Sequence, residues 1–244
     1  MTKDLTNELT SKLVDRVNAD FSRRVVIATH EMPWTASPQA GVERRLLDRI
    51  GGEVAKATSV VRYSPASNFP AHDHLLGEEF LVLDGVFADE HGSYAAGTYV
   101  RNPPGSHHAP HTVCGCTILV KLRQMNLVES ERVVIDTANV EWIAGDTVGH
   151  TRLVLYDARL DAGSAAYPER VTMEKLVAGV QLPESSCPGG EEIFVLSGAL
   201  EDGHEVYGAG TWIRNPVGYQ HRLMSTEETV FWMKRGHLCP YDMR

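Results

Sequence analysis

The sequence predicts an all-β protein made of two tandem copies of one domain, preceded by a short N-terminal helix. Three observations lead to this fold class. Short runs of β-branched and aromatic residues are separated by Gly, Pro, Asn and Asp, which is typical of a sandwich or barrel. The pattern of residues 24–122 returns over residues 131–235, and residues 3–17 show a helical repeat. In the first copy we expect strands over 25–28, 57–63, 79–83, 94–101 and 117–122.

The N-terminal segment has the pattern of an amphipathic helix. Apolar residues recur at every fourth position from Leu5 to Val17, which places them on one face of a helix over residues 3–17. A helix of this length is marginal by itself and needs a surface to dock on. We therefore expect it to pack on the body of the protein or on a second subunit. Because homodimers are the commonest oligomers, we expect a homodimer.

Matching residues at a constant offset establish the duplication. The segment from Gly77 to His108 recurs without a gap 113 positions later, and the segment from Arg24 to Trp34 recurs as Arg132 to Trp142 at an offset of 108. A repeat of this length indicates a duplicated domain rather than a solenoid unit. We place an N-terminal arm at 1–23, a first domain at 24–128 and a second at 129–244, with the seam in the polar stretch before residue 132.

Composition and charge exclude several functional classes. The 244 residues include 32 acidic and 23 basic side chains, for a net charge of −9 with no basic cluster, so we expect no nucleic-acid or anionic-membrane partner. No apolar run reaches the roughly 20 residues of a membrane span. The first residues are too polar for a signal peptide, so we expect a cytoplasmic protein. The four cysteines form no CxxC pair, so neither a disulfide framework nor a zinc knuckle is indicated.

The residues that carry chemistry gather around a His-x-His pair. His72 and His74 are two positions apart, so on a strand both imidazoles point to the same face. Glu78 follows after a short Leu-Leu-Gly connection, and His108 follows Gly105 by three positions, so both can arrive from neighbouring strands. Three nitrogens and one oxygen suit a divalent metal such as zinc or iron, while manganese, nickel and copper stay open.

The second copy has changed at this site. The counterparts of His72 and His74 are Ser185 and Cys187, whereas the glutamate and the third histidine persist. Two interpretations stay open. The second site is vestigial, or a thiolate completes a three-ligand zinc site with an open position. That second candidate site consists of Cys187, Glu191 and His221.

The spacing of these residues resembles the two motifs of the cupin superfamily. The first, Gly-x5-His-x-His-x3-Glu-x6-Gly, fits residues 66–85 except that Ala66 replaces its leading glycine. The second, Gly-x5-Pro-x-Gly-x2-His-x3-Asn, fits residues 97–112 except that Thr112 replaces its final asparagine. The resemblance implies two jelly-roll barrels, each of two antiparallel sheets closed around an interior that can hold a ligand.

The motifs also imply which residues bind the metal. The spacing favours Glu78 over the adjacent Glu79, which is then expected to accept a hydrogen bond from a ligating histidine. The implied ligands are His72, His74, Glu78 and His108.

Within the cupins, the amino-acid sequence of five segments is similar to the ChrR-type cupin. These segments are Val61 to Pro65, Phe69 to His74, Gly77 to Leu83, Asp89 to Glu90 and Tyr99 to Ser106. That family includes the C-terminal domain of zinc-dependent anti-sigma factors that respond to singlet oxygen and organic peroxides. The resemblance implies zinc, a sensory role and a sigma factor or other protein partner. The helical sigma-binding domain of those regulators has its own His-x3-Cys-x2-Cys site, which has no counterpart before Cys114.

Two functional hypotheses follow. In the first, the protein is a sensory or regulatory module for oxidative stress or for a small-molecule ligand. In the second, it is a metal-dependent cupin dioxygenase that cleaves a small diketone or a related substrate with iron or copper. One ligand set serves both classes, so fold analogy does not decide between them. No second group of acid, base or nucleophile is visible, which favours sensing.

Overall fold

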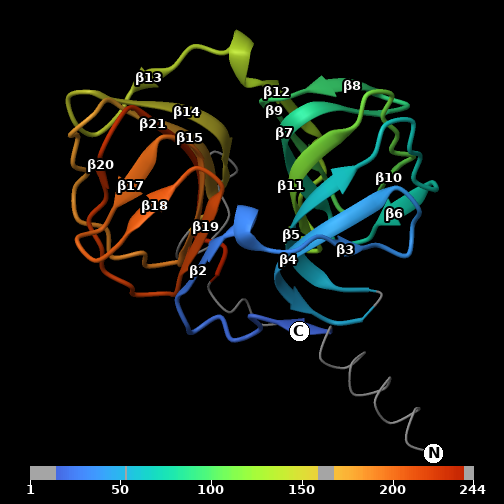
Figure 1. Cartoon of the computed structure of the whole chain (residues 1–244), viewed down its shortest axis with the longest axis horizontal. Helices are drawn as coiled ribbons and strands as arrows, with labels where there is room; N and C mark the ends of the chain where they lie inside the picture. Colours follow the sequence, from blue (N-terminus) through green and yellow to red (C-terminus); the bar gives the residue numbers. More distant parts are fainter. Residues whose placement is uncertain (1–14, 53, 159–167, 239–244) are drawn as a thin grey trace, which may run out of the picture. The chain divides into compact units, whose positions relative to one another are not determined.

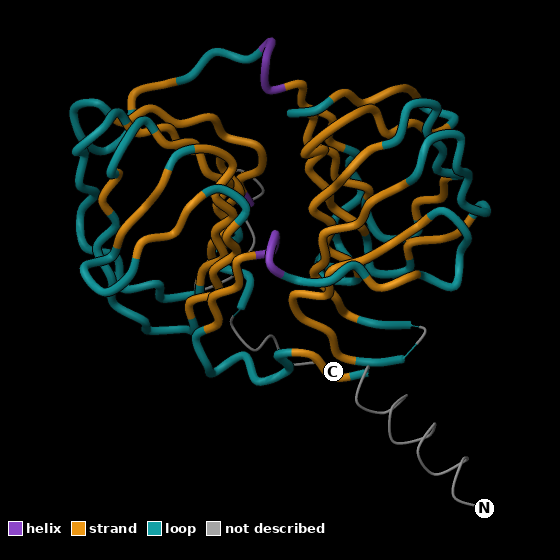
Figure 2. The backbone as a smooth tube through the Cα atoms, in the orientation of Figure 1, coloured by secondary structure: helices purple, strands orange, loops and turns teal. Residues whose placement is uncertain are grey.

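The computed structural model describes residues 15–52, 54–158 and 168–238, and in these ranges the chain is almost entirely strand and loop (Figures 1 and 2). The helical segments that it describes are two short 3-10 turns, η1 (Thr29–Glu31) and η2 (Thr137–Asn139). None of the described residues belongs to a helix of a length and hydropathy that could span a membrane. The predicted all-β class is confirmed.

The first compact unit contains a nine-stranded sheet with the order β1-β4-β5-β11-β7-β9-β12, to which β3 adds beside β4 and β8 beside β7. A small second sheet pairs β10 with β6. The strands are β1 (Arg16–Val17), β3 (Thr35–Ala36), β4 (Val42–Ile50), β5 (Lys56–Tyr63), β6 (His72–His74), β7 (Glu78–Asp89), β8 (Gly92–Ala95), β9 (Thr98–Asn102), β10 (Ser106–His108), β11 (Cys116–Leu122) and β12 (Val133–Asp136).

The second compact unit repeats this plan with a seven-stranded sheet of order β13-β14-β15-β21-β16-β19-β2 and a three-stranded sheet of order β18-β17-β20. The strands are β2 (Val25–Ala28), β13 (Ile143–Ala144), β14 (His150–Asp157), β15 (Arg170–Leu176), β16 (Glu191–Ser197), β17 (Ala199–Glu201), β18 (Val206–Gly208), β19 (Thr211–Asn215), β20 (Met224–Ser225) and β21 (Thr229–Arg235).

The two repeats exchange their first strands. Strand β2 begins the first repeat but pairs with β19 of the second unit, and β12 begins the second repeat but pairs with β9 of the first unit (Figure 1). The contacts therefore assign Asp20–Met32 to the second unit and everything from Pro33 to Asn139 to the first. Each barrel is thus completed by a strand that the other repeat contributes.

Each unit has its own apolar core on the inner face of its strands. Alternating residues of a strand point to opposite faces, so every second side chain of β7 and β11 enters the core of the first barrel. The two core clusters are Val42, Val61, Phe80, Val82, Phe87, Tyr94, Val100, Cys116, Ile118 and Val120 in the first unit and Leu176, Ile193, Val195, Leu200, Tyr207, Ile213, Leu223, Phe231 and Met233 in the second.

The motif glycine of the first copy permits a close strand approach. Gly85 has φ +72°, a conformation that L side chains rarely adopt, and a Cβ atom there would collide with the carbonyl oxygen of Gly115. The ladder between β7 and β11 shifts register at Thr117 and Ile118, next to this point. Strand β7 continues past this point to Asp89, which lies well beyond the predicted end of this strand.

The predicted N-terminal helix is not shown. Residues 1–14 lie outside the described residues, and Arg16 and Val17 form β1, which pairs with Ile50 and Arg49 of β4. The prediction that the helix extends to residue 17 is therefore wrong. Sheet pairing satisfies the backbone at this end, and Asn18 follows with φ 43° and donates from Nδ2 to the carbonyl oxygen of Leu47 at 2.6 Å.

Candidate metal centre

The His-x-His pair and the third histidine lie on two short paired strands. In the ladder between β6 and β10, His108 stands opposite His72, and His74 points to the same side as His72. The ring centroids are 4.7 Å apart for His72 and His74, 5.0 Å for His72 and His108, and 4.7 Å for His74 and His108. One ring nitrogen of each histidine lies within 4.8 Å of the others, so these three residues could hold a metal ion.

Glu78, at the start of β7, adds an oxygen to this cluster. Its Oε2 atom is 3.4 Å from Nε2 of His74 and 3.4 Å from Nε2 of His108, while the two nitrogens are 2.9 Å apart. Ligands bonded to zinc at 2.0–2.1 Å would lie about 3.0 Å apart at right angles and about 3.4 Å apart in a tetrahedron. The spacings among His74, His108 and Glu78 therefore lie in the range of donors to one divalent ion, and Glu78 borders the group of three histidines that could hold it.

Hydrogen bonds on the outer side direct the imidazoles inward. Nδ1 of His72 lies 2.8 Å from the carbonyl oxygen of Pro70, which can only accept, so in the neutral ring this nitrogen carries the proton and Nε2 has the free lone pair. Nδ1 of His108 lies 3.2 Å from Oδ2 of Asp89. Carboxylate and carbonyl acceptors behind ligating histidines are typical of metal sites, because they fix the tautomer and the ring orientation.

The electrostatics of the site favour a neutral His74. Burial lowers the pKa of His74, and His108 and His72 lower it further, while Glu78 acts in the opposite direction. Burial also acts to lower the pKa of His108, but the Asp89 hydrogen bond and the nearby carboxylates outweigh it and leave this pKa raised. Asp89 stays ionised because hydrogen bonds from His108 and Tyr94 overcome its burial and hold its pKa at about 2.

Glu79 does not join the cluster. It points to the opposite face of β7, where its Oε2 accepts hydrogen bonds from the hydroxyl of Tyr99 and from Nη1 of Arg101, both at 2.7 Å. The expectation that Glu79 accepts a hydrogen bond from a ligating histidine is not met in these contacts. Asp89 has that role for His108, and Asn102 contacts Glu78 from Nδ2 at 3.1 Å.

Sequence reasoning missed these outer residues, although a signal was present. Asp89 and Tyr94 recur at the same offset as the ligand positions, as Asp202 and Tyr207. A conserved offset alone does not say that a residue reaches the metal side of the barrel. Only the path of β7 and its pairing with β8 bring Asp89 beside His108.

The three candidate residues of the second half also come together. Cys187, Glu191 and His221 are buried, and their ligand atoms lie within 4.8 Å of one another, so this group too could hold a metal ion. Its internal contacts differ from those of the first half. Oε1 of Glu191 is 2.8 Å from Nε2 of His221, and Oε2 is 2.6 Å from Nε of Arg235.

These contacts set the charge state of the second group. Burial acts to raise the pKa of Glu191, but Arg235 and His221 outweigh it and bring the pKa down to about 2. Burial and the neighbouring Glu191 raise the pKa of the Cys187 thiol to about 12. The second half therefore presents a carboxylate that is already paired and a thiol that keeps its proton.

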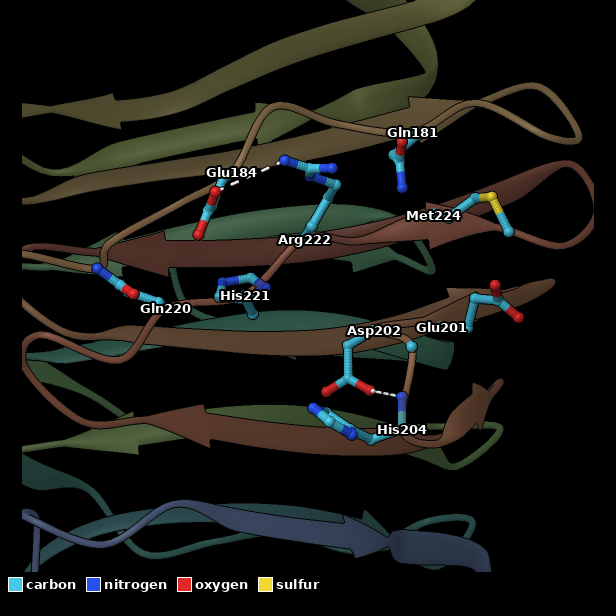
Figure 3. A pocket seen from close by; sticks show the side chains of 10 residues that line it. Gln181, Glu184, Glu201, Asp202, His204, Gln220, His221, Arg222 and Met224 are labelled. Carbon is cyan, nitrogen blue, oxygen red and sulfur yellow. Dashed lines mark hydrogen bonds and ion pairs between the residues drawn. The ribbon is translucent and has the colours of Figure 1, made fainter.

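A polar cavity of about 400 Å³ adjoins the second group. His221 lines it together with charged and amide side chains, among them Glu184 and Arg222, which form an ion pair at 3.5 Å (Figure 3). Asp202 lies on the other side of His221 in this view and accepts a hydrogen bond from the backbone N–H of His204 at 3.0 Å. Of the three residues of the second group, His221 is the one that lines this cavity.

Comparison with known proteins identifies the family. A family model described as the ChrR cupin-like domain matches the chain twice, over residues 22–126 and 130–239. The chain belongs to this family. Because the domain occurs twice, the protein is a ChrR-like bicupin, as the spacing of the motifs predicted. No protein with a curated description matches the sequence.

Solved structures share the fold of this ChrR-like bicupin at low sequence identity. A putative dioxygenase from Nostoc punctiforme PCC 73102 superposes with a TM-score of 0.70 and 15% identity, over 91% of this chain and 85% of that chain. A putative glyoxylate-induced protein from Pseudomonas aeruginosa gives a TM-score of 0.68 and 12% identity, over 87% of each chain. An oxalate decarboxylase from Bacillus subtilis gives 0.59 and 13%, over 86% and 76%.

Proposed function

We propose that the first half of this ChrR-like bicupin binds one divalent metal, with zinc as the resident ion, and that the protein is a sensory or regulatory module for oxidative stress or for a small ligand. The observation that carries this proposal is the group of three imidazoles whose nitrogens lie within 4.8 Å of one another, with the Glu78 carboxylate 3.4 Å from two of them. The proposed ligands are His72, His74, Glu78 and His108.

The exposure of the ligands suggests how a signal would reach the site. His74, Glu78 and His108 are buried, whereas His72 is partly exposed and packs edge-on against Phe69 at 5.0 Å. An oxidant or a small ligand would therefore meet the His72 side first. A bound zinc ion would supply positive charge and Lewis acidity but no redox chemistry, so an oxidant would act on the side chains around it.

The test of this proposal combines metal analysis with oxidant treatment. We expect zinc in the protein as isolated, and release of that zinc or a change in tryptophan fluorescence on treatment with singlet oxygen or an organic peroxide. Protein whose zinc content and fluorescence do not change under doses that oxidise free histidine would contradict the sensory role. His107→Ala serves as a matched control, because His107 is exposed and bonds Asp73 outside the cluster.

A metal-dependent cupin dioxygenase acting on a small diketone is the second candidate, and the likeness to a putative dioxygenase is what favours it. Such chemistry needs a redox-capable metal, so iron or copper loading should support dioxygen uptake while zinc should not. We expect no turnover of a diketone, flavonol and aromatic panel by the iron-loaded protein. Sustained uptake that disappears in His72→Ala would instead assign the dioxygenase function.

For partners we propose a sigma factor or another protein and a small-molecule ligand, with no nucleic acid and no membrane, in a cytoplasmic homodimer. The net charge of −9 supports the exclusion of nucleic acid. Light scattering on the full chain should give a mass near twice the monomer mass of 26.9 kDa. A monomer at all concentrations would contradict the dimer without affecting the metal centre.

A further inference from the structure

One arginine contacts several of the outer residues of the metal centre at once. Arg132 precedes β12 at the start of the second repeat, yet it lies in the first unit. Its Nε donates to Oδ1 of Asn102 at 2.9 Å, and its Nη2 donates to the hydroxyl of Tyr94 at 2.6 Å. The same Nη2 is 3.7 Å from Oδ2 of Asp89.

These contacts lead to two different metal-binding residues. Asn102 donates from Nδ2 to Oε2 of Glu78 at 3.1 Å. Tyr94 donates to Oδ1 of Asp89 at 2.8 Å, and Oδ2 of Asp89 lies 3.2 Å from Nδ1 of His108. Arg132 is thus connected by hydrogen bonds through Asn102 to Glu78 and through Tyr94 and Asp89 to His108.

The donor-only character of arginine gives these contacts a direction. A guanidinium can only donate, so Asn102 must turn its carbonyl oxygen toward Arg132 and its NH₂ group toward Glu78. For the same reason, the hydroxyl proton of Tyr94 is directed to Asp89 rather than to the arginine. Arg132 therefore fixes the orientation of the Asn102 amide and of the Tyr94 hydroxyl. Without Arg132, the amide could flip and the hydroxyl proton could point elsewhere.

The second unit contains the same arrangement around a different site. Arg24, at the start of the first repeat, donates to Oδ1 of Asn215 at 3.2 Å and to the hydroxyl of Tyr207 at 2.7 Å, and pairs with Asp202 at 2.9 Å. There the hydrogen bonds from the arginine through Tyr207 reach Asp202 but, in the part of the chain that the structure describes, do not continue to the histidine. Among the described residues, no hydrogen-bond partner reaches Nδ1 of His221. Arg24 is therefore a matched control for Arg132.

We propose that Arg132 is a positioning residue of the metal centre, delivered to the first barrel by the exchanged arm of the second repeat. This inference rests on the proposed metal binding in the first half. Its consequence is that metal affinity in one repeat depends on an arm encoded in the other. Loss of such outer contacts typically costs 10–100-fold in metal affinity, which sets the effect to look for.

The test measures metal affinity in the full chain by chelator competition, with zinc and with cobalt as a spectroscopic probe. We expect Arg132→Met to weaken metal binding by about 10–100-fold and to alter the visible cobalt spectrum. Arg132→Lys should recover only part of the affinity. An ammonium is a compact point charge and lacks the planar guanidinium that donates to Asn102 and to Tyr94 at the same time. Arg24→Met should leave the affinity of the first site unchanged.

Controls separate positioning from a loss of structure. The unfolding midpoint of the metal-free Arg132→Met protein should be at least as high as that of Arg24→Met, because Arg24 also bonds Asp202 at 2.9 Å whereas Arg132 lies 3.7 Å from Asp89. Tyr94→Phe removes only the branch to His108 and should give a smaller loss of affinity than Arg132→Met, which provides a second variant if the arginine variant does not fold.

The outcomes that overturn the inference are distinct from those that overturn the proposed function. Wild-type affinity and an unchanged cobalt spectrum in Arg132→Met would refute the role of Arg132 while leaving the metal centre intact. An equal loss of affinity in Arg24→Met would show a general loosening of the fold and would also refute it. A wild-type protein that binds no metal would refute the metal centre itself, and this inference with it.

Discussion

The two halves place the same buried glutamate in opposite electrostatic situations. In the first half, Oε2 of Glu78 faces two imidazole nitrogens at 3.4 Å each. In the second, Glu191 is contacted directly by His221 at 2.8 Å and by Arg235 at 2.6 Å. A buried carboxylate needs a compensating charge or hydrogen bonds. In the second half Arg235 supplies that charge, whereas in the first half Asn102 donates a hydrogen bond to Glu78 and the charge would come from the proposed ion.

A single substitution accounts for much of this difference. The residue that corresponds to Arg235 at the offset of 113 is Leu122, which cannot pair with a carboxylate. A metal in the second half would have to compete with Arg235 for Glu191 and would have to remove a proton from Cys187, whose pKa is about 12. We therefore expect the metal in the first half and not in the second.

The largest expected effect comes from the ligands themselves. Changing His74 or His108 to Ala removes an inward-facing nitrogen of the first cluster and should abolish metal binding, measured by elemental analysis after dialysis. His221→Ala is the control in the other half and should keep the full metal content. If His221→Ala lost as much metal as His74→Ala or His108→Ala, the proposed contrast between the two sites would be wrong.

A change at Arg235 should lower stability rather than metal content. Arg235→Leu leaves Glu191 buried without its cation, which for a fully buried pair costs about 3–5 kcal/mol. Since the side chain of Arg235 is 40% exposed and solvent screens the pair, we expect about 2 kcal/mol in urea unfolding. The exposed Arg222→Leu change is the control, with an expected loss of about 0.5 kcal/mol or less. Similar losses in both variants would argue against charge compensation by Arg235.

Acid should separate the halves by pH. The pKa of His108 lies above its usual value, so protons compete with the metal from above about pH 6.5 downward and should release it in mildly acidic solution. The pKa of Glu191 is lowered to about 2, so its pairing stabilises the fold above about pH 4.3 and is lost only as the pH falls toward 2. Bound metal and the circular dichroism of the fold, both measured across this pH range, should change in two separate steps, with metal release at the higher pH and unfolding at the lower. Metal that stays bound until the fold is lost would contradict this order.

The smallest expected effect is at Cys187. Cys187→Ser should leave the metal content unchanged, because the thiol keeps its proton and the half lacks both histidines of the first motif. The measurement is zinc per chain in the variant and in the wild type, prepared side by side. A fall of about half would show that the second group binds metal through its thiolate.

The first cluster was predictable because its motif spacing reports strand geometry directly. Alternation on β6 and pairing with β10 are enough to bring His72, His74 and His108 together. Most strand positions could also be predicted from the sequence, but not every strand boundary. The run expected over 94–101 is two strands, because Gly97 has φ +88° and turns the chain between β8 and β9.

The strand exchange was not predictable from the pattern. Arg24 and Arg132 recur as equivalent residues, but nothing local states which barrel each will join, because the contacts are made with residues far away in the sequence. Arg132 bonds Asn102 across 30 positions and Arg24 bonds Asn215 across 191. The pairing of Arg235 with Glu191 was hidden for the same reason, since it crosses between β21 and β16.

The most direct test of the central claim is the number of metal ions per chain in the purified wild-type protein, measured by elemental analysis against a protein concentration from amino-acid analysis. The contrast between the halves predicts a value close to one, which His72→Ala removes and Cys187→Ser preserves. A value near two that falls by half in Cys187→Ser, or metal-free protein with an intact fold, would contradict it.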